Sequence, residues 1–421
     1  MARTLTPQDS YALINALNAQ MNGSASLTAT DGSSFVAVGE TLLQAGTENV
    51  LNALGLVLGR TFMAVRPYDG KFNIINRVNS GLFAGRMRKI SFYSRAAEPA
   101  GFENTQLNPE NLLDGVDNTG SSSSGHERTP SMWEQNQPVP LEVNFGGSDV
   151  WQASTTIYEV QLQKAFRSEA DFNDFVSGIM TELGNDIEQQ KEAMNRNLVL
   201  NYIAGKIAMN VSGTVINLTS LYNSTFSTSY TTAQLQTTYL ESFLKFFVEQ
   251  VQTLSDRMTH RTAAYHWAPA KVGYQLLRHT PKDRQRLMLY NPFMIKARAY
   301  VMPSIFGPGY LSIDNYEGVD YWQSFNTPAA INFTPAILET NTSDSDYGTQ
   351  VAASAAVSQS YVLGVLYDAD ALMVDYQLDA SYSTPIEARK LYRNIWYSFR
   401  KNYCCDFTEN GVVFIMADPV T

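Results

Sequence analysis

The chain has 421 residues, a net charge of −10, and 44% hydrophobic and 12% aromatic residues. It is long enough to bury a sizeable core, in two domains or in one domain with large insertions, and too apolar to be disordered. Because sequence-independent nucleic-acid binding depends on neutralising phosphates, the acidic balance disfavours a protein that grips DNA. The two cysteines, Cys404 and Cys405, are adjacent, which favours reduced thiols in a reducing cytosol over a disulfide or a metal site.

No segment has the pattern of a signal peptide or of a membrane span. The longest apolar stretch, "NVLNALGLVLGRTFMAV", is interrupted by Asn52, Gly55, Gly59 and Arg60. It therefore falls short of the roughly 18 apolar residues that a spanning helix needs. We expect no membrane partner.

Residues 1 to about 80 are predicted to form an extended arm that carries short helices. The first helix places Tyr11, Ile14, Leu17 and Met21 on one face and ends at an Asn-Gly pair, which is a good C-terminal cap.

Two strands are predicted to form a long hairpin. The residues from Met87 to Arg95 and from Val150 to Phe166 alternate between apolar and polar side chains, as strands do. Residues 96–149, between them, are rich in Pro, Gly, Asn and Ser and cannot bury a compact core. A loop of this length without its own core is usually functional or disordered.

One long helix is predicted from Ser168 to Ala208. Its apolar stripe consists of Phe172, Val176, Ile179, Leu183, Ile187, Met194, Leu198 and Tyr202. A continuous helix of this length spans ~60 Å. Gly178 and Gly184 each cost about 1 kcal/mol relative to Ala in a helix interior, which predicts a kink or a close backbone approach.

The C-terminal half is predicted to mix helices and strands. A second amphipathic helix has an apolar face formed by Leu240, Phe243, Leu244, Phe247, Val251 and Leu254. Residues 260–380 then alternate strands and helices. Near the end, Asn410 and Gly411 separate two strand-like segments, and Asn-Gly is a strong signal for a hairpin turn.

The sequence contains few candidate catalytic residues or motifs. Asp256 and His260 have the spacing of two ligands on one helix face, with His266 nearby, but there is no third strong ligand in the vicinity. No nucleophile elbow, Walker loop or dinucleotide fingerprint occurs. A hydrolase that uses His260 or His266 remains an alternative. We expect no enzyme activity, and no catalytic, cofactor-binding or metal site.

Basic side chains cluster at the predicted hairpin base, where Arg86, Arg88 and Lys89 lie. A second group consists of Lys282, Arg284, Arg286, Lys296 and Arg298. Such clusters bind nucleic acid or pair with acidic residues of a neighbouring subunit, and the negative net charge favours the second interpretation.

A long arm, a long hairpin and a long helix do not close one compact globule, which indicates an assembly protein. In this order the chain resembles the major capsid proteins of tailed bacteriophages, which have the α+β, Hong Kong 97-type (HK97-like) capsid fold. The resemblance lies in these stretches: "SSFVAVGETLLQAGTENVLNALGLVLGRTFMAVRPYDGKF", "RMRKISFYS", "VWQASTTIYEVQLQKAFRSEADFNDFVSGIMTEL", "LYDADALMVDYQLDASYSTPIEARKLYRNIWYSF" and "DFTENGVVFIMADP".

The resemblance implies a division into five segments. They are an N-terminal arm (1–85), an extended loop made of a long hairpin with a polar tip (86–166), the spine helix of a peripheral domain (167–209), an axial domain (210–385) and C-terminal return strands of the peripheral domain (386–421). It also implies that the hairpin lies over an adjacent subunit. The candidate residues for this subunit interface are Arg86, Arg88 and Lys89 of one subunit. Their expected acidic partners on the adjacent subunit are Glu182, Asp186 and Glu188.

The same resemblance implies partners. The chain is expected to form pentamers and hexamers of an icosahedral phage head in the host bacterial cytoplasm and to become part of the virion. Packaged double-stranded DNA, a portal protein and a decoration protein are further expected partners. Because the chain begins at Met1, we expect a separate scaffolding protein. The alternative is an encapsulin-like compartment shell of the same fold, which the neighbouring genes would distinguish.

Overall fold

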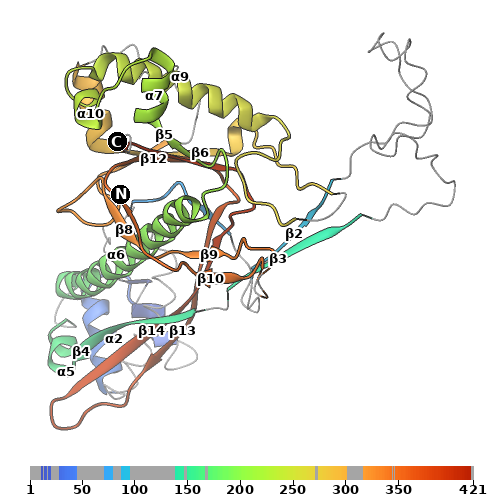
Figure 1. Ribbon diagram of the computed structural model, residues 1–421. Helices are drawn as coiled ribbons and strands as arrows, with labels where there is room; N and C mark the ends of the chain where they lie inside the picture. Colours follow the sequence, from blue (N-terminus) through green and yellow to red (C-terminus); the bar gives the residue numbers. More distant parts are fainter. Residues whose placement is uncertain are drawn as a thin grey trace, which may run out of the picture.

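The computed structural model is shown in Figure 1. It describes most of residues 11–19, together with residues 28–44, 71–78, 87–94, 138–146, 149–165, 169–270, 274–300, 316–343, 345 and 347–418. Arg86, the first residue of the predicted long helix, Ser168, and the predicted polar tip of the hairpin lie outside these residues.

A five-stranded sheet forms the centre of one layer, in the order β5-β15-β12-β6-β7. Its strands are β5 (Val215–Asn217), β15 (Gly411–Ile415), β12 (Val362–Asp368), β6 (Gln285–Tyr290) and β7 (Tyr316–Val319). All residues of β12 are buried, because helices cover both faces of the sheet.

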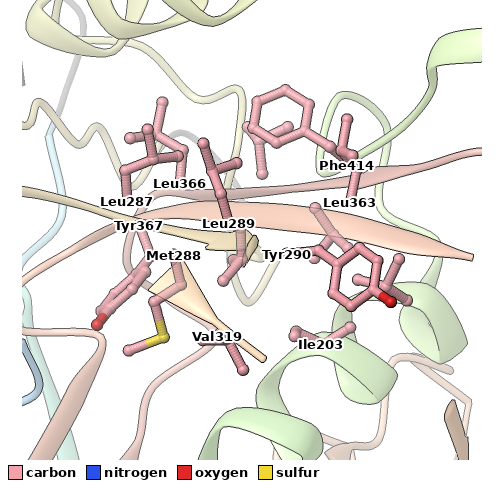
Figure 2. Close-up of a cluster of buried hydrophobic side chains, with 14 of the residues drawn as sticks. Ile203, Leu287, Met288, Leu289, Tyr290, Val319, Leu363, Leu366, Tyr367 and Phe414 are labelled. Carbon is pink, nitrogen blue, oxygen red and sulfur yellow. The ribbon is translucent and has the colours of Figure 1, made fainter. Parts of the chain in front are cut away.

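Helices α7 (Leu218–Phe226), α9 (Leu240–Thr259) and α10 (Asn291–Tyr300) lie on one face of this sheet, and α6 (Glu169–Met209) lies on the other (Figure 1). In Figure 2, Leu287 and Leu289 point to one side of β6, while Met288 points to the side where Ile203 of α6 lies. The predicted apolar face of α9 is confirmed, since all six of its residues are buried. A short helix, α8 (Thr232–Leu235), precedes α9.

Helix α6 is one continuous helix of 41 residues, as predicted. A Cβ at Gly178 would meet nothing within 4 Å, so the predicted close backbone approach there is wrong. The close approach occurs at Gly205, where a Cβ would overlap the ring of Phe407. In the described part of the chain, neither α6 nor any other helix has the apolar length needed to cross a membrane.

A four-stranded sheet, in the order β1-β13-β14-β4, lies on the other side of α6. Its strands are β1 (Asn76–Arg77), β13 (Leu372–Ser383), β14 (Tyr392–Cys405) and β4 (Asp149–Tyr158). Helices α2 (Gly32–Gln44) and α5 (Glu159–Ala165) lie near β4 and α6 (Figure 1). Alternate residues of β14, among them Ile395, Tyr397 and Phe399, are buried.

The long hairpin has a different second strand from the one predicted. Strand β2 (Met87–Phe92) pairs with β3 (Pro140–Phe145), whereas β4 pairs with β14. The prediction treated residues 140–145 as part of a structureless loop. In fact, they alternate between exposed and half-buried positions, a pattern that the surrounding Pro, Gly and Asn residues hid.

The predicted C-terminal hairpin at Asn410 and Gly411 is wrong. Strands β14 and β15 belong to different sheets, and residues 406–410 cross between them while fully buried. Neither Asn410 nor Gly411 has the positive φ that a type I′ turn requires. Gly411 is needed for packing, because a Cβ there would overlap the hydroxyl of Tyr202. The observed hairpin is β13–β14.

Two small two-stranded sheets complete the architecture. They pair β9 (Ala336–Leu338) with β10 (Gln350–Ala352), and β8 (Ile331–Phe333) with β11 (Val357–Gln359). Part of the N-terminal arm is fixed to the body near β7, since the carboxylate of Glu317 accepts hydrogen bonds from the backbone N–H groups of Phe72 and Ile74. Residues 72–77 of the arm are therefore bound to the body by these contacts and by the pairing of β1 with β13.

Candidate functional site

Lys89, on β2, is enclosed by acidic side chains of the 406–410 crossing. Its Nζ lies 2.7 Å from Oδ2 of Asp406 and 2.5 Å from Oε1 of Glu409. Nη2 of Arg278 lies 3.3 Å from the same Glu409 oxygen. The Lys89 side chain is 18% exposed and that of Asp406 only 1%, so water screens the pair weakly. These four side chains, here called the anchor cluster, fasten the hairpin to the point where the chain passes between the sheets.

The anchor cluster changes the acidity of its members. Burial raises the pKa of Glu409, and the cations of Lys89 and Arg278 oppose that rise. Burial alone would lower the pKa of Lys89, but the carboxylates of Asp406 and Glu409 outweigh it and raise that pKa above its ordinary value. At neutral pH, Lys89 is therefore a charged member of a shielded cluster.

Further contacts extend the attachment along β2. The Arg278 guanidinium donates to the hydroxyl of Ser91 at 2.9 Å. The backbones of Ser94 and Gln275 exchange hydrogen bonds of 2.7 and 2.8 Å. Thus the strand is held by two separate parts of the chain, the 261–278 segment and the 406–410 crossing.

Arg88 has a different environment from its neighbour Lys89. Its Nη2 lies 2.7 Å from Oε2 of Glu142 on β3, and the two side chains are 59% and 41% exposed. A hydrogen bond from Asn144, then the one from Arg88, lowers the pKa of Glu142. Since both partners face solvent, this pair is expected to contribute little to stability.

The three predicted acidic partners separate into two groups. Glu182 and Asp186 are exposed on α6 and border a shallow polar hollow beside Ser154 of β4. Glu188 is 4% exposed and pairs with Lys191 at 2.9 Å. Two of the three carboxylates are thus available on the surface, and the third already has a cation partner in its own helix.

One face of the four-stranded sheet carries exposed aromatic side chains. Tyr382 of β13 lies directly opposite Trp396 of β14, and Tyr392 lies opposite Tyr158 of β4, so the four share a face. Tyr382 is 66% exposed, Tyr158 45% and Trp396 37%. We call these four residues the aromatic face. Asn394 and Thr156, which are hydrogen-bonded to each other, lie between the two aromatic pairs. Several exposed large apolar side chains on one face of a sheet mark an interaction site.

The hairpin carries a second apolar surface. Ile90 and Phe92 on β2 are 52% and 58% exposed. They alternate with Lys89 and Ser91, which face the body of the chain through the contacts above. One side of β2 is therefore fixed, and its other side, which carries Ile90 and Phe92 beside Arg88, is open to solvent.

Sequence reasoning missed Arg278, Asp406 and Glu409. They come from two separate segments, and no local pattern links either segment to Lys89. A signal did exist, because "CCDFTENGVVF" places two acidic residues in an otherwise apolar stretch, and buried acidic residues need partners.

The histidine candidates are not brought together. His266 is 1% exposed, and its Nε2 lies 2.9 Å from the carbonyl oxygen of Leu276, so it cannot reach a substrate. Asp256 pairs with Lys282 at 2.5 Å, and His260 is exposed. Within the described ranges, no group of three or more metal-ligating side chains occurs.

The family model described as "Phi29-like phage major capsid protein" matches residues 132–415, which is more than half of the chain. Among curated proteins, none matches this chain.

Solved structures also resemble it. A chain in the capsid of Staphylococcus phage Andhra has a TM-score of 0.51 at 11% identity, over 84% of this chain and 85% of that one. A chain in the structure of the head fiber and inner core protein of native bacteriophage P68 has a TM-score of 0.46 at 10% identity, over 84% and 86%. A chain in the capsid of cyanophage P-SCSP1u has a TM-score of 0.39 at 13% identity, over 84% of this chain and 90% of that one. The predicted α+β, HK97-like capsid fold is confirmed.

Proposed function

This chain belongs to the family of Phi29-like phage major capsid proteins, and on that premise we propose that its copies assemble into pentamers and hexamers. These close an icosahedral head around double-stranded DNA. The observation that carries the proposal is the family match, which spans the hairpin strand β3, α6 and both sheets. The exposed aromatic face supports it, because a neighbouring copy would cover that surface.

The sheets suggest revised domain limits within the proposed subunit. We assign the four-stranded sheet and α6 to the peripheral domain, and the five-stranded sheet with α7, α9 and α10 to the axial domain. Strand β13 then moves to the peripheral domain and β15 to the axial domain. Residues 210–214, 369–371 and 406–410 become the three connections between them. The arm and the extended loop keep their proposed roles.

The hairpin β2–β3 is proposed to lie over an adjacent subunit, with Ile90 and Phe92 against its surface. Arg88 is the hairpin cation best suited to meet Glu182 and Asp186 of that subunit, since all three side chains are exposed. Lys89 has partners within its own chain, and Glu188 has Lys191, so they are left out of the pairing.

A charge reversal tests this pairing. Arg88→Glu is expected to slow or abolish assembly while leaving the fold intact, and Glu182→Arg with Asp186→Arg is expected to restore it in part. Light scattering during assembly is the measurement. Unchanged assembly of Arg88→Glu would reject the pairing without touching the broader proposal.

Other partners follow from the proposed role. A separate scaffolding protein would guide closure in the host cytoplasm, a portal protein would occupy one vertex, and a decoration protein would bind the outer surface. DNA contact would be weak and non-specific, because a net charge of −10 per copy repels phosphates and lets the genome leave.

Electron microscopy of the purified chain, alone and with its scaffolding protein, tests the proposal. Closed shells with pentameric and hexameric units are expected. A small monodisperse species under all conditions would contradict it. Shells that take up a cargo enzyme instead of DNA would favour the encapsulin-like alternative.

A further inference from the structure

Phe325 is held away from the body of the chain. It is 82% exposed, more than any other large apolar side chain in the described residues. The turn that carries it is fixed, since the N–H of Thr327 donates to the carbonyl of Ser324 at 3.2 Å and the N–H of Trp322 donates to that of Pro328 at 2.9 Å. Trp322 itself is 1% exposed and its indole N–H donates to the carbonyl of Val362 at 2.8 Å. The ring of Phe325 lies edge-on to the ring of Tyr321, with 6.1 Å between the two centroids, and the rest of its surface is open to solvent.

A pocket of about 590 Å³ lies beneath the hairpin β2–β3, between β3, α6 and the β9–β10 pair. Leu141, Val143, Trp267, Ile337, Tyr403 and Phe407 contribute to its walls. Among the described residues that line it, the charged one is Glu142, and Arg88 pairs with it. A pocket whose walls carry several aromatic and aliphatic side chains, and whose one described charge is paired with Arg88, suits an apolar ring and not a phosphate.

The chain cannot fill this pocket with its own Phe325. The turn is attached to α6 through Arg196, whose Nη1 donates to the carbonyl of Tyr321 at 2.7 Å and whose guanidinium stacks 3.7 Å from that residue's ring centroid. The pocket-lining residues of α6 include Met194, Leu198 and Asn201. At about 100° per residue, these lie roughly 140–160° around the helix from Arg196, and Asn197, which also lines the pocket, lies about 100° from it.

Figure 1 agrees with this placement. Strand β8, which follows the Phe325 turn, and strand β3, which borders the pocket, lie at opposite sides of the view. An exposed apolar side chain and a complementary pocket on different sides of one molecule form a head-to-tail contact between copies, which closes into a ring or continues as a chain.

We propose that Phe325 of one copy enters the pocket beneath the hairpin of the next copy. The pocket can take a phenyl ring together with part of the turn that carries it. This contact repeats around a ring of subunits and places the fixed base of each hairpin over the neighbouring turn. The proposal rests on the proposed self-assembly and names the residues that join adjacent copies.

Thiol crosslinking in assembled shells tests the contact. Gln350 lines the pocket and is exposed, so Phe325→Cys with Gln350→Cys places one thiol on the turn and one at the pocket without disturbing the core. A short bis-maleimide is expected to give a ladder of covalent oligomers on a denaturing gel. The matched control is Phe226→Cys with Gln350→Cys, since Phe226 is also an exposed phenylalanine, 52% exposed, but lies on α7. Wild-type shells serve as the blank for Cys404 and Cys405.

The outcomes are distinct. A ladder from the Phe325 pair and none from the control supports the proposal. Shells that give no ladder, or the same ladder with the control pair, overturn it and leave the proposed function standing. Failure of the wild-type chain to form shells would overturn both.

A second measurement does not depend on crosslinking. Phe325→Asp is expected to unfold at the same temperature as the wild type, because the side chain is exposed. Its threshold concentration for assembly is expected to rise about tenfold or more, since each subunit loses a buried ring. Phe325→Leu is expected to stay near the wild-type threshold. An unchanged threshold for Phe325→Asp would contradict the proposal.

Discussion

The two larger sheets of this chain are covered to different extents. Helices lie on both faces of the five-stranded sheet, and its central strand β12 is buried throughout. The four-stranded sheet packs α6 on one face and presents Tyr158, Tyr382 and Trp396 to solvent on the other. The five-stranded sheet therefore contributes most to the stability of the isolated chain. The exposed face of the four-stranded sheet is a surface that we infer a neighbouring copy covers.

The anchor cluster joins the two sheets and the hairpin at one place. Residues 406–410 leave β14 in one sheet and enter β15 in the other, and Lys89 of the hairpin binds to them. The covered five-stranded sheet and the partly exposed four-stranded sheet are therefore linked through buried charges. Substitutions in the covered sheet should mainly lower the free energy of unfolding, and those on the exposed face should mainly impair assembly.

The largest expected loss of stability is in the covered sheet. Leu366 on β12 is fully buried, and Leu366→Ala should lower the free energy of unfolding by about 3 kcal/mol, from lost burial and the remaining cavity. Leu391→Ala, at a residue that is 45% exposed, should change it by less than about 1 kcal/mol. Urea denaturation of unassembled subunits measures both. Equal losses would mean that the two regions do not differ as described.

The next largest effect is expected at the anchor cluster. Lys89→Met leaves the buried carboxylates of Asp406 and Glu409 with one cation fewer and should cost about 2 kcal/mol or more. Arg88→Met, one residue away in an exposed pair, should cost less than about 1 kcal/mol. The same denaturation experiment compares them. A larger loss of unfolding free energy for Arg88→Met than for Lys89→Met would mean that the anchor cluster does not attach the hairpin to the body.

A pH effect is expected at Lys206 of α6, which lies near the anchor cluster. Burial lowers its pKa from 10.5 to about 7, against the opposing effect of Asp406. Above pH 7 the unfolded chain holds a proton that the folded chain has lost, so stability should rise with pH, by up to about 1.4 kcal/mol per unit.

This dependence can be measured between about pH 7 and 8, where the cysteine thiols of the unfolded chain, with an ordinary pKa of about 8.5, are still mostly protonated. Lys206→Met should remove the rise, and Lys245→Met, at an exposed helix position, should keep it. A rise that persists in Lys206→Met would assign the titration to another group.

The smallest effect on stability is expected on the aromatic face. Tyr382→Ser, at a residue that is 66% exposed, should change the free energy of unfolding by less than about 1 kcal/mol, yet it should impair assembly. Thr225→Ser, at an exposed position of α7 on the other sheet, should assemble like the wild type. Light scattering records assembly. Normal assembly of Tyr382→Ser would show that this face is not part of a subunit contact.

Local sequence patterns predicted those helices in which buried residues recur at regular spacing along the sequence. Helix α9 and the length of α6 followed from apolar residues at helical spacing. The resemblance to phage capsid proteins supplied the fold class, which the residue patterns alone did not determine.

Long-range pairing is where the predictions were wrong. The alternation of residues 150–166 was interpreted as one strand, but residues 159–165 form helix α5. The partner of β4, strand β14, lies more than 230 positions away, and alternation does not say which strand pairs with which. The Asn-Gly signal at residue 410 was overridden because Tyr202 packs against Gly411 and the chain passes into another sheet. Nothing near Lys89 in the sequence indicated Asp406, Glu409 and Arg278.

The central claim is that a neighbouring copy covers the aromatic face of the four-stranded sheet in the assembled shell. Hydroxyl-radical footprinting of free subunits and closed shells, read by mass spectrometry, tests it most directly. Tyr382 and Trp396 should be oxidised in free subunits and protected in shells, while Tyr367, which is fully buried, should remain unmodified in both. Equal oxidation of Tyr382 and Trp396 in free subunits and in shells would contradict the claim.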